Sequence, residues 1–141
     1  MGAVIDRKSA LPYCWPMGLI IKRLRVVGDK GERRLRVLFD TGASASFVRR
    51  DAVAGIATTL KLPSPESYTL GDGVARLRVN ETAVLYVYIS GIRISDNFIV
   101  APRLSDEAII GANTLQKWRI KLDMEKESVI IDKRMARLLL A

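Results

Sequence analysis

The chain contains 141 residues, of which 49% are hydrophobic and 27% are charged, and these values are typical of one globular domain with its own core. It has no histidine and a single cysteine, which excludes an intrachain disulfide, catalytic groups that depend on histidine, and zinc sites built from histidine or from four cysteines. The formal net charge of +8 makes nucleic acid a candidate partner, and acid–base chemistry must come from Asp, Glu, Lys or Tyr.

The start of the chain predicts an irregular lead-in over residues 1–16, which includes Pro12 and Pro16. The apolar stretch 11–21 is interrupted by both prolines and ends at Lys22, so it falls short of the roughly 20 apolar residues of a membrane span. It also lacks the basic start and the small-residue cleavage site of a secretory signal. We therefore expect a soluble, cytoplasmic protein with no membrane partner.

The first predicted strands form a hairpin. Two strand-like stretches, 19–27 and 33–40, flank the sequence GDKG at 28–31, and glycines in so short a connection favour a tight turn. A short helix over 46–57 and a proline-containing loop over 61–67 are predicted to follow.

The second half of the chain continues the strand-rich pattern. A hairpin over 68–79 carries Gly71, Asp72 and Gly73 at its tip. The elements predicted after it are strands at 82–89, 93–101 and 107–111, a short helix at 113–118 capped by Asn113, and a hairpin that pairs 119–123 with 128–132. Many short strands with closely spaced turns indicate an all-β sandwich or barrel.

One stretch, VLFDTGASASFV at 37–48, runs from three apolar residues directly into Asp40. A carboxylate at the end of a buried strand requires hydrogen-bond donors, a charged partner, or a proton shared with a neighbouring acid. Thr41, Gly42 and a run of small residues follow it. This Asp-Thr-Gly sequence is therefore the main candidate for a reactive site.

Three features occur in an order that resembles the retroviral-type aspartic proteases and their cellular and prokaryotic single-lobe relatives. They are the Asp-Thr-Gly sequence after an apolar strand, the glycine-tipped hairpin, and AIIGANTL at 108–115. The resemblance covers roughly residues 17–132. It implies an all-β, closed acid-protease-like barrel with one or two short helices, which assembles as a homodimer and uses no metal ion and no cofactor. Residues 133–141 form a C-terminal extension whose apolar end is a candidate dimer contact.

The resemblance also implies roles for individual residues. Asp40 is the expected catalytic aspartate, Thr41 is expected to hydrogen-bond across the dimer, and the N–H of Gly42 is expected to approach the carboxylate. The hairpin 68–79 is the expected flap over the substrate. The expected substrate-binding residues are Leu38, Ala43, Gly71, Asp72, Gly73 and Ile109. Three positions depart from the family, which often has acidic residues at the first two and an arginine at the third: Ser44, Ala45 and Ala112.

The need for two carboxylates explains the expected homodimer. One carboxylate cannot both deprotonate a water molecule and protonate the scissile carbonyl, whereas two carboxylates that share one proton can. The chain has one Asp-Thr-Gly sequence and is too short for a second lobe, so the second Asp40 must come from a second copy. We therefore expect an aspartic endopeptidase that cleaves extended or unfolded polypeptide.

Other interpretations stay open at the level of sequence. Asp40 could be an ordinary aspartate in a turn, or the chain could be a catalytically silent dimeric binding module that associates with nucleic acid through basic clusters at 22–25, 33–36, 49–50 and 133–137. Alternating basic residues are more simply explained as the solvated face of strands. Enzymes that form an aspartyl phosphate also place an aspartate after an apolar strand, but they usually need further acidic residues and an α/β scaffold.

Overall fold

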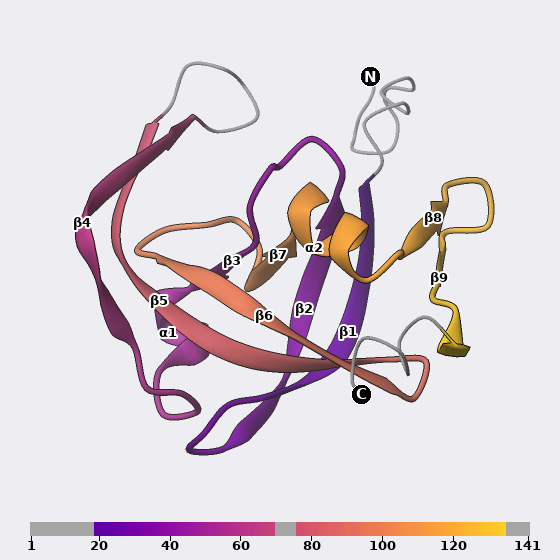
Figure 1. The fold of residues 1–141 in the computed structure, drawn as a ribbon, viewed down its shortest axis with the longest axis horizontal. Coiled ribbons are helices and arrows are strands. Elements are labelled where there is room, and N and C mark those ends of the chain that lie inside the picture. The colour runs from indigo at the N-terminus through magenta and orange to yellow at the C-terminus, as the bar shows by residue number, and fades with distance from the viewer. Residues whose placement is uncertain (1–18, 70–75, 135–141) are drawn as a thin grey trace.

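The computed structural model describes residues 19–69 and 76–134 (Figure 1). In chain order the elements are β1 (Leu19–Val27), β2 (Glu32–Asp40), β3 (Phe47–Arg49), α1 (Arg50–Val53), β4 (Leu60–Thr69), β5 (Arg76–Ile89), β6 (Ile92–Ala101), β7 (Ala108–Ile110), α2 (Ala112–Lys117), β8 (Lys121–Asp123) and β9 (Ser128–Ile130).

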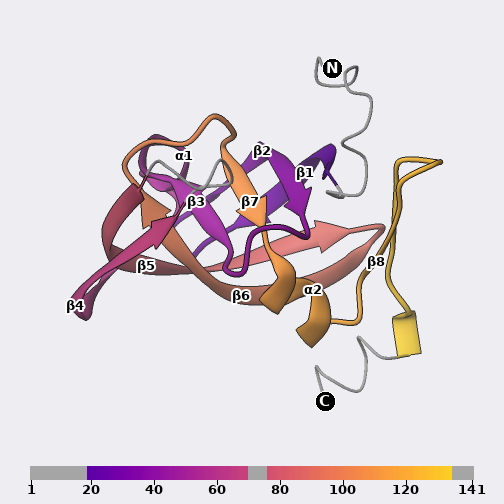
Figure 2. The same ribbon diagram turned by 90° about the horizontal axis from the view of Figure 1, so that it is seen from above.

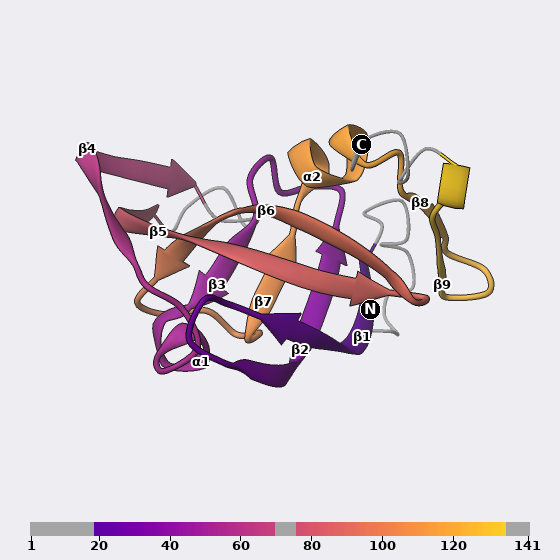
Figure 3. The same cartoon turned by 60° about the horizontal axis from the view of Figure 1, so that its bottom comes forward.

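Six of the strands close into a barrel. The strand order of the main sheet is β1-β2-β7-β3-β6-β5-β4, and the far side of β1 also pairs with β5, with Val26 opposite Val87 and Val27 opposite Tyr86. Strand β4 lies outside the closed part, on β5, while β8 and β9 form a separate hairpin. Figures 1 and 3 show β4 and the β8–β9 hairpin at opposite ends of the molecule. The predicted all-β closed barrel with short helices is confirmed.

The strands enclose the main core because successive side chains alternate between the two faces. In β5, Leu85, Val87 and Ile89 are buried, whereas Tyr86 between them is exposed. Phe39 of β2 is fully inaccessible within the same core. The predicted strands at 19–27, 33–40, 82–89, 93–101 and 107–111 are confirmed. The strand at 82–89 is continuous with the second arm of the predicted hairpin over 68–79, and together they form β5 from Arg76 to Ile89.

The predicted helix over 46–57 is largely wrong. Its first part is strand β3, and α1 covers only Arg50–Val53. Phe47 and Val48 are buried, and β3 runs parallel to β6 and antiparallel to β7. Phe47 and Val48 are buried between two strands, and this position stabilises an extended backbone even though the spacing of apolar residues in this segment also suits a helix.

The predicted loop over 61–67 is also wrong, because β4 runs through it from Leu60 to Thr69. Proline cannot donate a ladder hydrogen bond, which is why Pro63 and Pro65 argued against a strand. Here the strand is at the edge of the sheet, and its register with β5 shifts between Lys61 and Glu66. An edge strand with a bulge accommodates both prolines.

The described residues after β7 match the prediction except for one cap. Helix α2 and the β8–β9 hairpin are present, but the N-cap of α2 is Gly111, and no side chain caps it. Asn113 instead donates its backbone N–H to the carbonyl oxygen of Ser44, at 3.0 Å. The start of α2 is therefore held by the loop that follows β2.

The tip of the predicted hairpin over 68–79, with Gly71, Asp72 and Gly73, lies outside the described residues. Its two arms are present, since Tyr68 pairs with Leu77 in the antiparallel β4–β5 ladder. Across residues 19–69 and 76–134, no helix has the length and apolar character needed to cross a bilayer.

Candidate functional site

Asp40 is the last residue of β2, with β1 on one side and β7 on the other. Its neighbour Phe39 is in the core, so the alternation of the strand places Asp40 and Leu38 on the opposite face. Leu19 is the cross-strand partner of Asp40 and is exposed. The carboxyl group is therefore partly buried at the open face of the barrel wall.

The turn after β2 brings backbone donors to this carboxyl group. The N–H of Gly42 donates to Oδ1 of Asp40 at 2.8 Å, and the N–H of Ala43 donates to the carbonyl oxygen of Asp40 at 3.2 Å. Thr41 and Gly42 are exposed, and Ala43 is partly buried. The predicted approach of the Gly42 N–H is thus present in the structure.

Burial raises the pKa of Asp40 above its ordinary value, because a low-dielectric setting disfavours the charged carboxylate. The backbone N–H groups of Gly42 and Ala43 act in the opposite direction and stabilise the anion. The negative charge of Asp106, in the loop before β7, adds a smaller increase in the pKa of Asp40. The net result is a carboxyl group that holds its proton to a higher pH than a free aspartate does.

Backbone hydrogen bonds bind the loop after Asp40 to the start of α2. The two segments lie beside each other in Figures 1 and 2. The N–H of Ala112 donates to the carbonyl oxygen of Ala43 at 2.7 Å, next to the bond from Asn113 to Ser44. Ala112 is one of the predicted departures from the resembled family, and here its backbone N–H holds the loop. Residues more than sixty positions apart thereby fix the position of the Asp40 turn.

Gly111 allows this close approach. A Cβ atom at Gly111 would overlap the carbonyl oxygens of Ala45 and Ala43, so a side chain cannot be placed there without moving backbone. Its N–H donates to Oγ of Ser46 at 3.0 Å. The glycine is thus required by space rather than by an unusual φ, which is −97°.

Sequence reasoning missed a buried hydroxyl network beneath the loop. Oγ of Ser46 lies 2.6 Å from Oγ1 of Thr114, and Oγ1 of Thr114 donates to Oδ2 of Asp96 at 2.8 Å. Ser46 and Thr114 are the buried polar residues of the described chain. The available signal was weak: a serine before an apolar pair, and a threonine three positions after Gly111.

Leu38 and Ile109 lie side by side in the parallel β2–β7 pairing. Leu38 is 9% exposed and Ile109 is partly buried, so together they form an apolar surface on the face that carries Asp40. Ile109 also packs against a second hydrophobic cluster, distinct from the main core, formed by Phe47, Leu77, Val79, Ile99 and Ala101.

This second cluster extends along the β4–β5 hairpin toward its tip, where Tyr68 packs against it. The ring of Tyr68 meets Phe47 edge-on, with ring centroids 5.2 Å apart. Burial, with a hydrogen bond to Glu66, raises the pKa of Tyr68 to about 12, so its hydroxyl stays neutral and donates. This end of the hairpin is thereby tied to the apolar surface beside Asp40.

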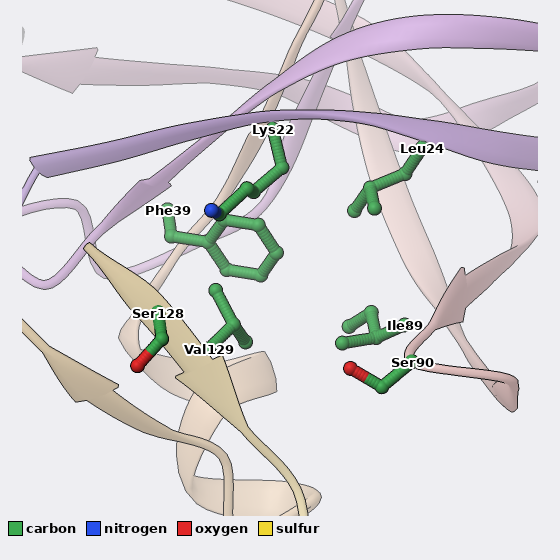
Figure 4. Close-up of a pocket in the computed structure, with 7 residues that line it drawn as sticks. All are labelled: Lys22, Leu24, Phe39, Ile89, Ser90, Ser128 and Val129. Atoms are coloured by element: carbon green, nitrogen blue, oxygen red, sulfur yellow. The ribbon is translucent and has the colours of Figure 1, made fainter. Parts of the chain in front are cut away.

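One pocket of the described structure lies away from Asp40. It has a volume of about 270 Å³ and is lined by Lys22, Leu24, Phe39, Ile89, Ser90, Ser128 and Val129 (Figure 4). Phe39 lines it and Asp40 follows on the opposite face of β2, so the wall of the barrel separates the pocket from the carboxyl group. Within residues 19–69 and 76–134, acidic and cysteine side chains form no group of three that could hold a metal ion.

The structure therefore brings together most of the predicted site residues. The members that lie around the end of β2 are Leu38, Asp40, Thr41, Gly42, Ala43 and Ile109. Gly71, Asp72 and Gly73 are outside the described residues. Asp106 and the Ser46–Thr114–Asp96 network are additions that only the structure supplies.

Comparison with solved structures shows the fold. The retroviral protease-like domain of Ddi1 from Leishmania major matches with a TM-score of 0.57 and 18% identity, over 82% of this chain and 89% of that one. The EIAV protease, solved with the inhibitor HBY-793, matches with a TM-score of 0.45 and 20% identity, over 72% of this chain and 93% of that one. No family model and no curated protein matches the sequence. The chain has a retroviral protease-like fold.

Proposed function

We propose that the protein is an aspartic endopeptidase that cleaves extended or unfolded polypeptide and acts as a homodimer. The observation that carries this proposal is the setting of Asp40: a partly buried carboxyl group with a raised pKa, bonded to the Gly42 N–H at the end of β2. A carboxyl group that holds its proton to a higher pH than a free aspartate is suited to acid–base chemistry. The fold shared with a retroviral protease-like domain supports the same assignment.

In the proposed mechanism two Asp40 carboxyl groups, one from each subunit, share one proton. The ionised carboxylate takes a proton from a water molecule, whose oxygen attacks the peptide carbonyl, while the protonated carboxyl donates to the carbonyl oxygen. Collapse of the tetrahedral intermediate breaks the C–N bond: the carboxyl group that took the proton from water donates it to the leaving amine, and the other carboxylate takes a proton from a hydroxyl of the intermediate. The pair of carboxyl groups thereby returns to its singly protonated state. Leu38 and Ile109 offer apolar contact to the substrate side chains.

The peptide is expected to bind as an added strand beneath the β4–β5 hairpin, which acts as the flap. The direct test is to incubate the purified chain with a reduced, alkylated protein across a pH series and to identify new termini by mass spectrometry. Cleavage at defined bonds, strongest at mildly acidic pH, is expected. Absence of any cleavage by a folded, dimeric chain at every pH would overturn the proposal.

We predict that cleavage depends on subunit association. Each subunit supplies one Asp40, so the active species follows the dimer fraction by mass action. Well below the dimer dissociation constant, a tenfold dilution should lower specific activity by about tenfold. Activity should be measured over a concentration series alongside sedimentation velocity. Full specific activity at concentrations where the chain sediments as a monomer would contradict the homodimer.

We predict that Ala43→Ser shifts the pH profile of cleavage to lower pH. A hydroxyl at this position can donate to the Asp40 carboxylate, which favours the charged form and lowers its pKa. Activity requires the singly protonated pair, so the alkaline limb of the bell-shaped profile should move downward. Wild type and variant should be compared on one peptide substrate. An alkaline limb that stays in place or moves upward would show that no such bond forms.

A further inference from the structure

A second surface lies at the far end of β2 from Asp40. On the outward face of β1, β2, β5 and β6, five side chains form a continuous series that we name the arginine–tyrosine ladder: Arg34, Arg25, Tyr88, Arg93 and Tyr86. Arg34 is directly opposite Arg25 in the β1–β2 pairing, and Tyr88 is directly opposite Arg93 in the β5–β6 pairing. The strands concerned run next to one another in Figure 3.

Cation–π contacts join the two halves of the ladder. The guanidinium carbon of Arg25 lies 4.5 Å from the centre of the Tyr88 ring, and that of Arg93 lies 4.9 Å from the centre of the Tyr86 ring. Such contacts hold flexible arginine side chains in place over an aromatic surface. From Arg25 onward, the ladder thus alternates positive charge and aromatic ring across the wall of the barrel.

The positions of these arginines lower the stability of the fold. Like charges directly opposite each other on antiparallel strands are destabilising, and β1–β2 contains two such pairs, Arg25 with Arg34 and Arg23 with Arg36. Arg25 is bonded to Glu32 at 2.9 and 3.1 Å. Among the described residues, Arg34, Arg23 and Arg93 form no ion pair with an acidic side chain, and all three are exposed. This surface therefore carries positive charge that the described chain does not neutralise.

The chemistry of the ladder indicates the partner. Guanidinium groups match phosphate oxygens with two parallel hydrogen bonds, and tyrosine rings stack on bases that are not held in a duplex. An acidic peptide would meet the charge but not the rings, and the bases of a duplex are already stacked on each other. We propose that the arginine–tyrosine ladder binds single-stranded nucleic acid.

This surface is separate from the proposed catalytic site. Arg34 precedes Asp40 by six positions on one strand, which is a separation of roughly 20 Å. The proposal does not rest on peptide cleavage, and Asp40→Asn should bind nucleic acid as the wild type does. Failure of one proposal can therefore be told from failure of the other.

The test is fluorescence anisotropy of the full chain with a labelled 15-nucleotide single strand, as RNA and as DNA, from 50 to 300 mM KCl. The ladder variant Arg34→Gln/Arg93→Gln is compared with the control Lys121→Gln/Lys126→Gln, which removes the same charge from exposed residues of the β8–β9 hairpin. The ladder variant should bind at least tenfold more weakly than wild type, and the slope of its log binding constant against log salt concentration should be smaller in magnitude by about 1.4. The affinity of the control should stay within twofold of wild type. Equal weakening of both variants would show that net charge alone attracts the strand, and would overturn the proposal.

A second measurement tests the rings. Tyr86→Leu keeps every charge, and it should weaken single-strand binding at least fivefold, because a stacked base is lost. Polyglutamate, added as a competitor of the labelled single strand, should compete equally weakly for wild type and for Tyr86→Leu. The proposal is overturned if Tyr86→Leu binds the single strand like wild type, if polyglutamate or a duplex of equal charge competes as well as the single strand, or if no binding occurs at 50 mM KCl. Thermal unfolding of each variant confirms that the fold is retained.

Discussion

Asp40→Asn is expected to lower peptide cleavage by several orders of magnitude while the chain stays folded. The amide cannot take a proton from water or share one with a second acid, so the central step of the proposed chemistry is lost. Its oxygen can still accept the hydrogen bond from Gly42, which is 2.8 Å long in the wild type. Cleavage rate should be measured on one peptide, with dimerisation followed by sedimentation. Turnover near the wild-type rate would exclude Asp40 as a catalytic residue.

Asp106→Asn is the matched control. It removes the acidic side chain that acts electrostatically on Asp40, and its ion pair with Arg36 is long, at 3.9 Å. If the second carboxylate comes from the partner subunit, this variant should keep cleavage within about tenfold of wild type. A loss as large as that of Asp40→Asn would indicate a pair of acids within one chain instead of across a dimer.

The stability of Asp40→Asn gives an independent check on the raised pKa. An acid whose pKa is higher in the folded than in the unfolded chain loses stability as pH rises through the folded value. Asparagine has no such loss. The variant should therefore have the higher free energy of unfolding at neutral pH, and the difference should disappear below the ordinary pKa of aspartate, 3.8. Urea unfolding at both extremes measures it.

Gly111→Ala is expected to damage both stability and cleavage. The new Cβ would overlap the carbonyl oxygens of Ala45 and Ala43, and backbone cannot rotate away as a side chain can. Overpacking of this kind costs about 3 kcal/mol of unfolding free energy. Because those carbonyls belong to the loop that positions Asp40, cleavage by the folded fraction should also fall by about 100-fold.

Two other glycines serve as controls for Gly111→Ala. A Cβ at Gly31 would meet its nearest atom, the carbonyl oxygen of Gly55, at 3.5 Å, so Gly31→Ala should change neither property. A Cβ at Gly28 would overlap Ile56 and Ala57, far from the loop, so Gly28→Ala should lower stability but not cleavage by the folded fraction. If Gly28→Ala impaired cleavage as much as Gly111→Ala, the effect at Gly111 would be one of general stability.

The sequence by itself determined those strands and turns that depend on residues close together in the chain. The strands around 28–31 and the part of β5 at 82–89 follow from alternating apolar residues and short glycine-containing turns, which act over a few positions. The Asp-Thr-Gly turn is local for the same reason, since the donor at Gly42 is two residues from the carboxyl group it binds. The chain has one Asp-Thr-Gly sequence and is too short for a second lobe, which led to the expectation that a second copy of the chain supplies the second aspartate.

Only the tertiary structure decided the parts that depend on residues far apart in the chain. Phe47 and Val48 form a strand because β6 and β7 lie on either side of them. Pro63 fits within β4 because that strand is at the edge of the sheet and contains a bulge. Ser46 and Thr114 are 68 positions apart, and their hydrogen bond exists only once β7 delivers α2 to the Asp40 loop. The arginine–tyrosine ladder likewise arises from closure of the barrel between β1 and β5. Such contacts depend on strand order and register, which are set by the fit of the whole core and not by the pattern of any one segment.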